Sequence, residues 1–201
     1  MLQKNISLRG KMVSLRGINE TDFGKIVKWR NDPEINRYLN QPFRLTVEMQ
    51  AKWYYEKYLP SDDILFVFVT NDSNIPIGTL GVNDIDYDLR RAIAGRLLIG
   101  EKKYRGSVEL LEGNLIFYDF LFYILGLKEV YCHIVRENKK AIALDTRLGF
   151  FINKSGNVYP DYCCVNNMHL IEMVNTKASY KEHKNKLLPM LEHFISQNEK
   201  L

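Results

Sequence analysis

Four segments in the middle of the chain decide its fold: RAIAGRLLIG (Arg91–Gly100), KKYRGSVELLEG (Lys102–Gly113), EVYCHIVREN (Glu129–Asn138) and KKAIALDTRLGF (Lys139–Phe150). They predict a strand, a basic glycine turn that opens a long helix, a second strand, and a short helix that ends in Leu-Gly-Phe. A turn that feeds a helix presents unpaired backbone N–H groups and the positive end of the helix dipole. The order therefore indicates a phosphate-binding cradle beside a splayed sheet.

The turn itself holds three basic residues that suit a pyrophosphate: Lys102, Lys103 and Arg105. Gly106 allows the backbone to approach a ligand closely, and the amides of Ser107 and Val108 open the helix. A plain strand-to-helix connection with solvated lysines explains the same residues. The turn alone leaves both interpretations open.

Length and composition limit the function classes. With 201 residues, 46% of them hydrophobic and 26% charged, we expect one globular domain with a genuine core. The net charge of +4 is mild, and it favours a local site for an anionic ligand over a nucleic-acid-binding face. The sequence contains neither an apolar run of about 20 residues nor a signal peptide at its start, so we expect a cytoplasmic protein without a membrane partner.

Cysteines and histidines give no metal-binding pattern. The three cysteines, Cys132, Cys163 and Cys164, lack framework spacing, which favours reduced, buried thiols over a redox or metal pair. The four histidines, His133, His169, His183 and His193, show no paired ligand spacing. We expect no metal.

The remaining segments predict an α/β (α+β) fold. Strands are expected at Lys11–Ile18, Ile64–Thr70, Ile75–Asp88, Phe151–Asn153 and Val165–Val174. Helices are expected after caps at Thr21 and Thr46, at Glu34–Leu39, at Ser107–Leu125 and in the tail from Thr176. The prediction is a mixed, largely antiparallel central sheet flanked by helices. Residues 1–175 form the domain, and residues 176–201 form an additional C-terminal helix packed on it.

At this point the chain resembles the GCN5-related N-acetyltransferase (GNAT) superfamily. Its coenzyme-binding motif reads here Lys103-Tyr104-Arg105-Gly106-Ser107-Val108, and its second motif is Asn138, Ala141 and Leu148-Gly149-Phe150. Glu112-Gly113 stands where the ribosomal-protein-acetylating branch has Glu-Ala, and the order of elements from about residue 9 to 174 is similar too. Within the superfamily, the chain most resembles the branch of ribosomal-protein and amino-sugar-nucleotide N-acetyltransferases.

The resemblance implies acetyl-CoA as co-substrate. The pyrophosphate would lie on the amides of Arg105 to Val108, the pantetheine would pair with the backbone of Leu97, Leu98 and Ile99, and Asn138 and Ala141 would line the coenzyme arm. A splay between strands Ala92–Ile99 and Glu129–Arg136 would admit the thioester, with strand amides free to polarise its carbonyl.

Two residues depart from the family pattern. Val108 fills the second small position of the cradle, so its side chain must point away from the pyrophosphate. Asp145 stands where many members have a tyrosine that protonates the departing thiolate. We interpret Asp145 as a solvated residue on the helix surface, since it is an acid only if burial raises its pKa. Water, Tyr159 or Tyr162 is the alternative proton donor.

The acceptor must be a neutral amine, so a base is expected near the splay. His133 lies in the strand and titrates near neutrality, although a lone strand histidine is more often structural. Glu101, just past the end of the other strand, is the second candidate, with a surface charge as the alternative. Proximity and a water relay need neither residue.

The acceptor itself is suggested by the N-terminal segment. Trp29, Arg30 and Asn31 resemble the Trp-Arg-Asn stretch of members that acetylate amino sugars on nucleotide carriers, and a looser segment in those that acetylate ribosomal protein N termini. Helix termination with an inward-packed tryptophan explains the same residues.

We therefore expect direct acetyl transfer to a primary amine, favouring an amino-sugar nucleotide of surface-polysaccharide biosynthesis. A protein N terminus is the alternative acceptor, and a non-catalytic acyl-CoA-binding scaffold is the alternative class. A homodimer is left open.

Overall fold

The computed structural model describes residues 4–154, 156–160, 164–165 and 168–198. The chain divides into two compact units. The first unit contains Met1–Ile85 and Gly95–Ile116, and the second contains Asp86–Ala94 and Phe117–Leu201. Strand β5 and helix α4 contribute residues to both units.

The first unit is built on a sheet. Its strands follow the chain in the order β1 (Ser7–Arg9), β2 (Val13–Gly17), β3 (Ile64–Thr70), β4 (Pro76–Asp86) and the end of β5 (Arg91–Ile99). The pairs from β1 to β4 are antiparallel. All residues of β3 are buried, as its continuous apolar sequence predicts.

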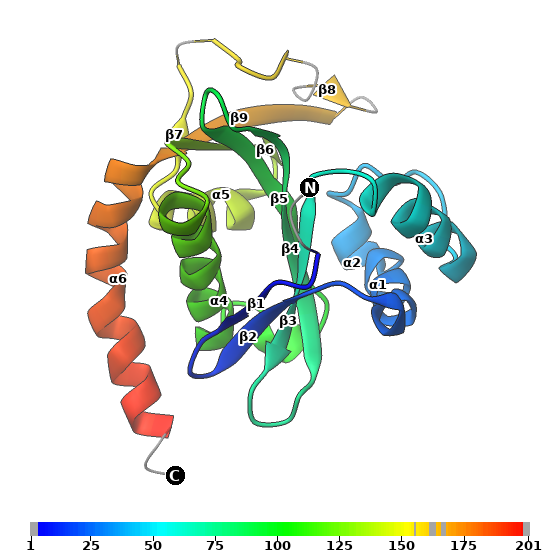
Figure 1. Cartoon of the computed structure of the whole chain (residues 1–201), viewed down its shortest axis with the longest axis horizontal. Coiled ribbons are helices and arrows are strands. Elements are labelled where there is room, and N and C mark those ends of the chain that lie inside the picture. Colours follow the sequence, from blue (N-terminus) through cyan, green and yellow to red (C-terminus); the bar gives the residue numbers. More distant parts are fainter. Residues whose placement is uncertain (1–3, 155, 161–163, 166–167, 199–201) are drawn as a thin grey trace. The chain divides into compact units, whose positions relative to one another are not determined.

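Three helices of the first unit gather beside β3 and β4 (Figure 1). They are α1 (Phe23–Arg30), α2 (Pro33–Asn36) and α3 (Val47–Trp53). A 3₁₀ turn (Glu20–Asp22) precedes α1, a π turn (Tyr54–Tyr58) continues α3, and a second 3₁₀ turn (Lys102–Tyr104) leads towards α4 (Val108–Asp119). Thr46 caps α3, as expected, and Asp32 caps α2. The predicted cap at Thr21 was wrong, because the side chain of Asn19 accepts the Thr21 N–H and makes a capping box with Asp22.

The buried carboxylate of Glu112 connects α4 to the β1–β2 hairpin. Glu112 accepts backbone N–H bonds from Lys11 at 2.7 Å, Met12 at 2.8 Å and Val13 at 2.9 Å. The next residue, Gly113, faces the ring of Phe68, and a Cβ there would lie 2.3 Å from a ring carbon. Glu112 therefore ties α4 to the hairpin. Because residue 113 is glycine, α4 also packs closer to Phe68 than a residue with a side chain would allow.

The second unit contains the start of β5, followed in the sheet by β6 (Glu129–Val135), β9 (Met168–Thr176) and β7 (Phe151–Ile152). Strand β6 is parallel to β5 and antiparallel to β9, and β8 (Cys164–Val165) pairs with β9. The helices are the end of α4 with its π turn (Phe120–Ile124), α5 (Lys139–Arg147) and α6 (Lys177–Asn198). Tyr180 anchors α6: it is fully buried, stacks on Phe122 and donates to Asp119.

The predicted fold class is confirmed. The observed fold is mixed α/β, with a mostly antiparallel sheet, flanking helices and an additional C-terminal helix. Gly126 ends the long helix segment with φ +70°, as a C′ residue should. Pro189 lies inside α6 and does not divide it. Strands β1 and β8 were not predicted, since each is too short for a periodic pattern.

No helix among the described residues is long and apolar enough to cross a membrane.

Glu112→Gln should lower the free energy of unfolding by about 2–4 kcal/mol, because an amide nitrogen would replace one of two accepting oxygens in front of backbone donors. Urea denaturation measures the loss. Glu109→Gln, on the same helix, is the matched control and should cost less than about 1 kcal/mol. Equal losses in the two variants would contradict the anchoring role of Glu112.

Candidate active site

The end of β5 is fixed by a tryptophan. Trp29 of α1 lies against Gly100, where a Cβ would stand 2.1 Å from ring carbons, so only glycine fits. The indole Nε1 donates to Glu101 Oε1 at 3.2 Å, and the N–H groups of Gly100 and Glu101 both donate to Ile77 O. Trp29 is buried, with 4% of its surface exposed. The structure thus brings together two predicted site residues, Trp29 and Glu101, although their roles towards a substrate stay predictions.

The turn after β5 has the geometry of an anion cradle. Gly106 has φ +80°, with open space where a Cβ would point. The N–H groups of Arg105 and Ser107 donate to carbonyls within the turn, those of Lys102 and Tyr104. Among the described residues, no group accepts the N–H of Gly106 or of Val108. These two amides, at the open side of the turn and the start of α4, are the ones left for an anion.

A residue that the sequence did not single out already faces the turn. Glu34 of α2 makes ion pairs with Lys102 and Arg105, each at 3.1 Å. Hydrogen bonds from Lys102 and Arg105 lower the pKa of Glu34. The pairs are solvent-exposed, so they are easily exchanged for a stronger anion. Lys103 instead lies over the ring of Tyr104, which is buried.

The predicted pantetheine segment lies in β5 beyond its ladder with β6. The β5–β6 register covers Arg91, Ala92 and Ile93, well before β5 ends at Ile99. Leu98 is buried in the first unit's core, while Leu97 and Ile99 are partly exposed. Ile99 O accepts from Arg105 Nε at 3.2 Å, and a contact of this segment with a pantetheine arm stays a prediction.

Asn138, in the second unit, caps α5. Its Oδ1 accepts the N–H of Ala141 at 3.3 Å, and this bond accounts for the asparagine without any ligand. A contact of Asn138 or Ala141 with a coenzyme stays a prediction.

Asp145 corrects the sequence interpretation. It is not a solvated surface residue: only 9% of it is exposed, and it lies on the same face of α5 as Ala141 and the fully buried Leu148. Its Oδ2 accepts the thiol of Cys132 at 3.5 Å. Burial raises the pKa of Asp145 to about 7, since one weak thiol donor compensates little of the lost hydration. Asp145 is therefore about half protonated near pH 7.

His133 is tied to a buried carboxylate. Its Nε2 lies 3.0 Å from Glu172 Oε2, and Glu172 also accepts from Asn153 Nδ2 and the backbone N–H groups of Val158 and Tyr159. Burial lowers the pKa of His133, while Glu172 opposes that shift. For Glu172, burial favours the neutral form, but the hydrogen bonds outweigh it and lower the pKa. His133 as the base stays a prediction.

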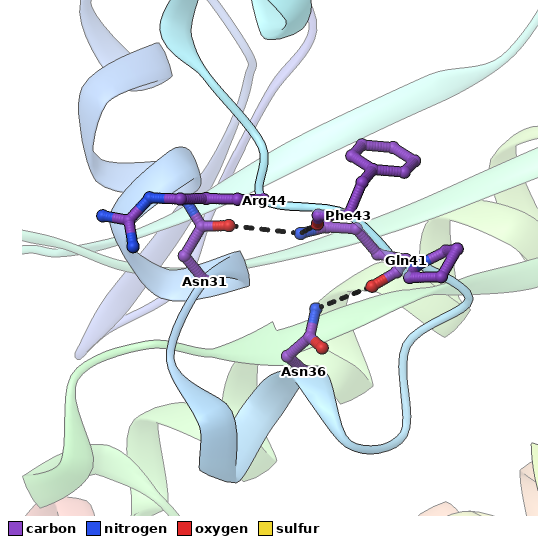
Figure 2. Close-up of a pocket in the computed structure, with 6 residues that line it drawn as sticks. Asn31, Asn36, Gln41, Phe43 and Arg44 are labelled. Carbon is purple, nitrogen blue, oxygen red and sulfur yellow. Dashed lines mark hydrogen bonds between the residues drawn. The ribbon is translucent and has the colours of Figure 1, made fainter.

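A cavity of about 260 Å³ lies in the loop before α3, lined by Asn31, Asn36, Gln41, Pro42, Phe43 and Arg44 (Figure 2). Its amides bond mainly to one another and to the loop. Asn31 donates from Nδ2 to Leu45 O and accepts the Leu45 N–H at Oδ1. Asn36 donates to Gln41 O at 3.2 Å, and Gln41 Nε2 donates to Asn31 Oδ1 at 3.3 Å. Figure 2 shows Phe43 and Arg44 pointing away from each other. The amides therefore hold the loop in shape and do not converge on a ligand.

The same network reaches Arg30, because Gln41 Oε1 accepts from Arg30 Nε at 2.7 Å. Gln41 is 3% exposed, and only its neighbour Pro42 hints at an ordered turn in the sequence. The roles of Gln41 and Glu172 were not predicted, because each hydrogen-bonds to a side chain far from it in the sequence.

Some predictions fall outside the described residues: Tyr162, Cys163 and the side chain of Cys164. Cys132 is buried, as expected. Tyr159 packs its ring against Tyr131 and His133. In the described part of the chain, no group of His, Cys, Asp and Glu residues could hold a metal ion.

Comparison with known proteins agrees with this geometry. The sequence matches the Acetyltransferase (GNAT) domain over residues 13–151. The chain therefore belongs to the GNAT acetyltransferase family. No curated protein matches the full sequence significantly.

Solved structures share the fold at low identity. A structure described as apo FdhC, a nucleotide-linked sugar GNAT, has a TM-score of 0.72 and 22% identity, covering 93% of this chain and 99% of its own. Spermidine N-acetyltransferase from Vibrio cholerae, with CoA and spermine, has a TM-score of 0.69 and 20% identity, covering 85% and 99%. A GCN5-related N-acetyltransferase from Brucella melitensis has a TM-score of 0.77 and 15% identity, covering 94% and 86%.

Asp145→Asn should stabilise the protein more at high pH than at low pH. The folded pKa of about 7 lies above the unfolded value of 3.8, so wild-type stability falls as pH rises between these values and the loss is complete above them. From pH 5 to pH 8, the difference in unfolding free energy between variant and wild type should grow by about 3 kcal/mol in the variant's favour.

Urea denaturation at the two pH values measures this difference. Asp88→Asn, at an exposed aspartate, is the control and should show a constant difference. A pH-independent effect of Asp145→Asn would show that the folded protein does not hold the proton there.

Proposed function

We propose that this acetyltransferase moves the acetyl group of acetyl-CoA directly to the primary amine of a small molecule, with an amino-sugar nucleotide as the favoured acceptor. The observation that supports coenzyme binding most is the turn after β5. It combines a glycine at positive φ with open space, two amides without an acceptor among the described residues, and three basic side chains.

The chain's own residues would hold acetyl-CoA by its phosphates and its arm. Gly106 and Val108 donate backbone N–H groups to the pyrophosphate, and Arg105 adds a fork of donors once it leaves Glu34. The backbone of Leu97–Ile99 holds the arm. Bound acetyl-CoA supplies the acetyl group as a thioester, which an amine attacks without any covalent enzyme intermediate.

The reaction needs one residue that accepts a proton and one that donates a proton. The acceptor ammonium must lose a proton, and the departing thiolate must gain one. Asp145 stands at the family's acid position, and burial raises its pKa to about 7, so it is partly protonated near neutrality, which supports it as the donor. Glu101 is partly exposed beside Trp29 and supports a base role, while His133 is engaged with Glu172.

The acceptor proposal rests on the Trp-Arg-Asn stretch and on the amide network that fixes it. Gln41 holds Arg30 at the end of α1, where a guanidinium suits phosphate. A nucleotide-linked sugar GNAT is among the structures that share the fold, which is consistent with this acceptor. Transfer to a protein N terminus is the competing acceptor.

Thiol release from acetyl-CoA tests the proposal. With an amino-sugar nucleotide, we expect steady release, with kcat/KM at least about 100-fold above that for a peptide N terminus or spermidine. Faster release with the peptide would identify a protein N terminus, and not an amino-sugar nucleotide, as the acceptor. Tight coenzyme binding without release for any amine would favour a non-catalytic scaffold and overturn the proposal.

Gly106→Val tests the cradle separately. The variant places a side chain where the phosphates would lie and forces a β-branched residue to positive φ, so affinity for CoA should fall at least about 10-fold in calorimetry. Gly156→Val is the matched control, because Gly156 also has positive φ and open space but lies in another loop. Its backbone strain should lower stability and leave CoA affinity intact. Unchanged affinity in Gly106→Val would refute the cradle.

A further inference from the structure

A cavity of about 280 Å³ lies within the second unit, over the face of β6 that points away from α5. Cys132 contacts Asp145 of α5, so its neighbour Tyr131 points to the opposite face of the strand. The described part of the lining comes from β6, β9, β7 and the loop after β7, and it includes Glu129, Tyr131, Phe151, Val158, Val174 and Thr176. None of these residues belongs to the turn after β5 or to the N-terminal segment. The cavity is therefore separate from the cradle.

Glu129 supplies the negative charge of this cavity. It pairs with Thr176 across the ladder between β6 and β9, and Tyr131 pairs with Val174, so these side chains share one face of the sheet. The Tyr131 hydroxyl donates to Glu129 Oε2 at 2.7 Å, which holds the carboxylate in place. Within the described ranges, no Lys, Arg or His side chain pairs with Glu129. The carboxylate thus lines a cavity without a counter-charge from the protein.

The other charged groups near the cavity do not supply that counter-charge. Arg91 is the neighbour of Glu129 across the β5–β6 ladder, but its Nε lies 3.6 Å from Asp86 Oδ2. Glu172 lies behind the wall and keeps its negative charge, since hydrogen bonds lower its pKa. Burial lowers the pKa of His133, which favours its neutral form. With Arg91 balanced by Asp86, the surroundings carry an excess of negative charge.

The walls beside Glu129 are aromatic and aliphatic. The ring of Phe151 is half exposed, and it lies beside Val174 in the ladder between β7 and β9. Aromatic rings attract an ammonium through their negative faces, and aliphatic walls suit a short alkyl chain. A metal ion needs several oxygen ligands, whereas the described residues contain no group of acidic, histidine or cysteine side chains that could hold one. The lining therefore matches an organic cation.

We propose that this cavity binds an alkylammonium ion, with Glu129 as its counter-charge and with Tyr131 and Phe151 as walls for the alkyl chain. The inference goes beyond the proposed function, because it depends neither on the cradle nor on any acetyl transfer. Two sources supply this chemistry: the amine of the acceptor before it loses its proton, and a separate amine that acts as an effector. Binding tests the cavity, and kinetics distinguish the two sources.

NMR titration of the ¹⁵N-labelled protein measures the binding without turnover. The probe is butylammonium chloride, n-butanol is the neutral molecule of the same chain length, and potassium chloride controls for ionic strength. Butylammonium should give saturable shifts at residues of the cavity and bind at least about 10-fold more tightly than butanol, because only the cation gains from the carboxylate. Absence of saturation, equal shifts with potassium chloride, or equal binding of butanol would overturn the proposal.

Two variants test the named residues against matched controls. Glu129→Gln removes the charge but keeps an oxygen for the Tyr131 hydroxyl, and it should weaken butylammonium binding at least about 10-fold. Glu137→Gln, at an exposed glutamate just beyond β6, should leave the binding unchanged. Phe151→Ala should weaken it about 3- to 10-fold, whereas Ile152→Ala, at the equally exposed next residue of β7, should not. Wild-type affinity in Glu129→Gln would refute the site.

Acetyl-transfer kinetics identify the source of the ammonium. If butylammonium is itself acetylated, or if it raises the acceptor KM at constant kcat and Glu129→Gln removes that effect, the cavity holds the amine of the acceptor. If butylammonium binds but changes kcat or neither constant, the cavity holds a separate amine. Binding in a protein that acetylates no amine would remove the proposed function and leave this site standing. An active acetyltransferase that does not bind butylammonium would refute this inference alone.

Discussion

The contact of Trp29 with Gly100 is the constraint on which the rest of the first unit's functional end depends. Because the ring occupies the space of a side chain at residue 100, α1 packs directly against the end of β5. The indole bond to Glu101 then fixes the start of the basic turn. Arg30 follows Trp29 directly, so the packing that positions the basic turn also positions the end of α1, where Arg30 donates to Gln41. The contact of Trp29 with Gly100 thus positions both the basic turn after β5 and Arg30.

Buried carboxylates show how hydrogen bonding, more than burial, decides a group's chemistry here. Glu172 accepts four hydrogen bonds, and its pKa is lowered although it is buried. Asp145 is also buried but receives one thiol, and its pKa rises to about 7. The first fits a structural anchor of a loop, and the second fits a group that exchanges a proton near neutrality. A tyrosine at position 145 could donate a proton at neutral pH even when exposed. An aspartate can donate one there only because burial raises its pKa.

Sequence reasoning predicted the elements whose information is local. The apolar run Ile64–Thr70 and the cap at Thr46 are encoded within a few residues, and both were found as expected. The burial of Asp145 was missed because it depends on what α5 packs against, which periodicity reports only weakly in a helix of nine residues. Gln41 was missed for a similar reason: its function is a bond to a side chain eleven residues away. The positive φ of Arg96 was missed as well, because Gly-Arg within RAIAGRLLI reads as part of a regular strand.

The acceptor of a GNAT enzyme is decided by few residues on a common frame. The chain shares its fold with a nucleotide-linked sugar GNAT and with a spermidine N-acetyltransferase, so the fold alone discriminates neither substrate. What differs between such acceptors is the sign of the charge that must be accommodated. Arg96 has φ +57°, and its guanidinium lies 5.3 Å from the centre of the Trp53 ring, so a strained backbone position holds a cation beside an aromatic ring. Strand β5 therefore combines a backbone end that we propose for the coenzyme arm with a strained arginine, Arg96, that adds positive charge to the first unit.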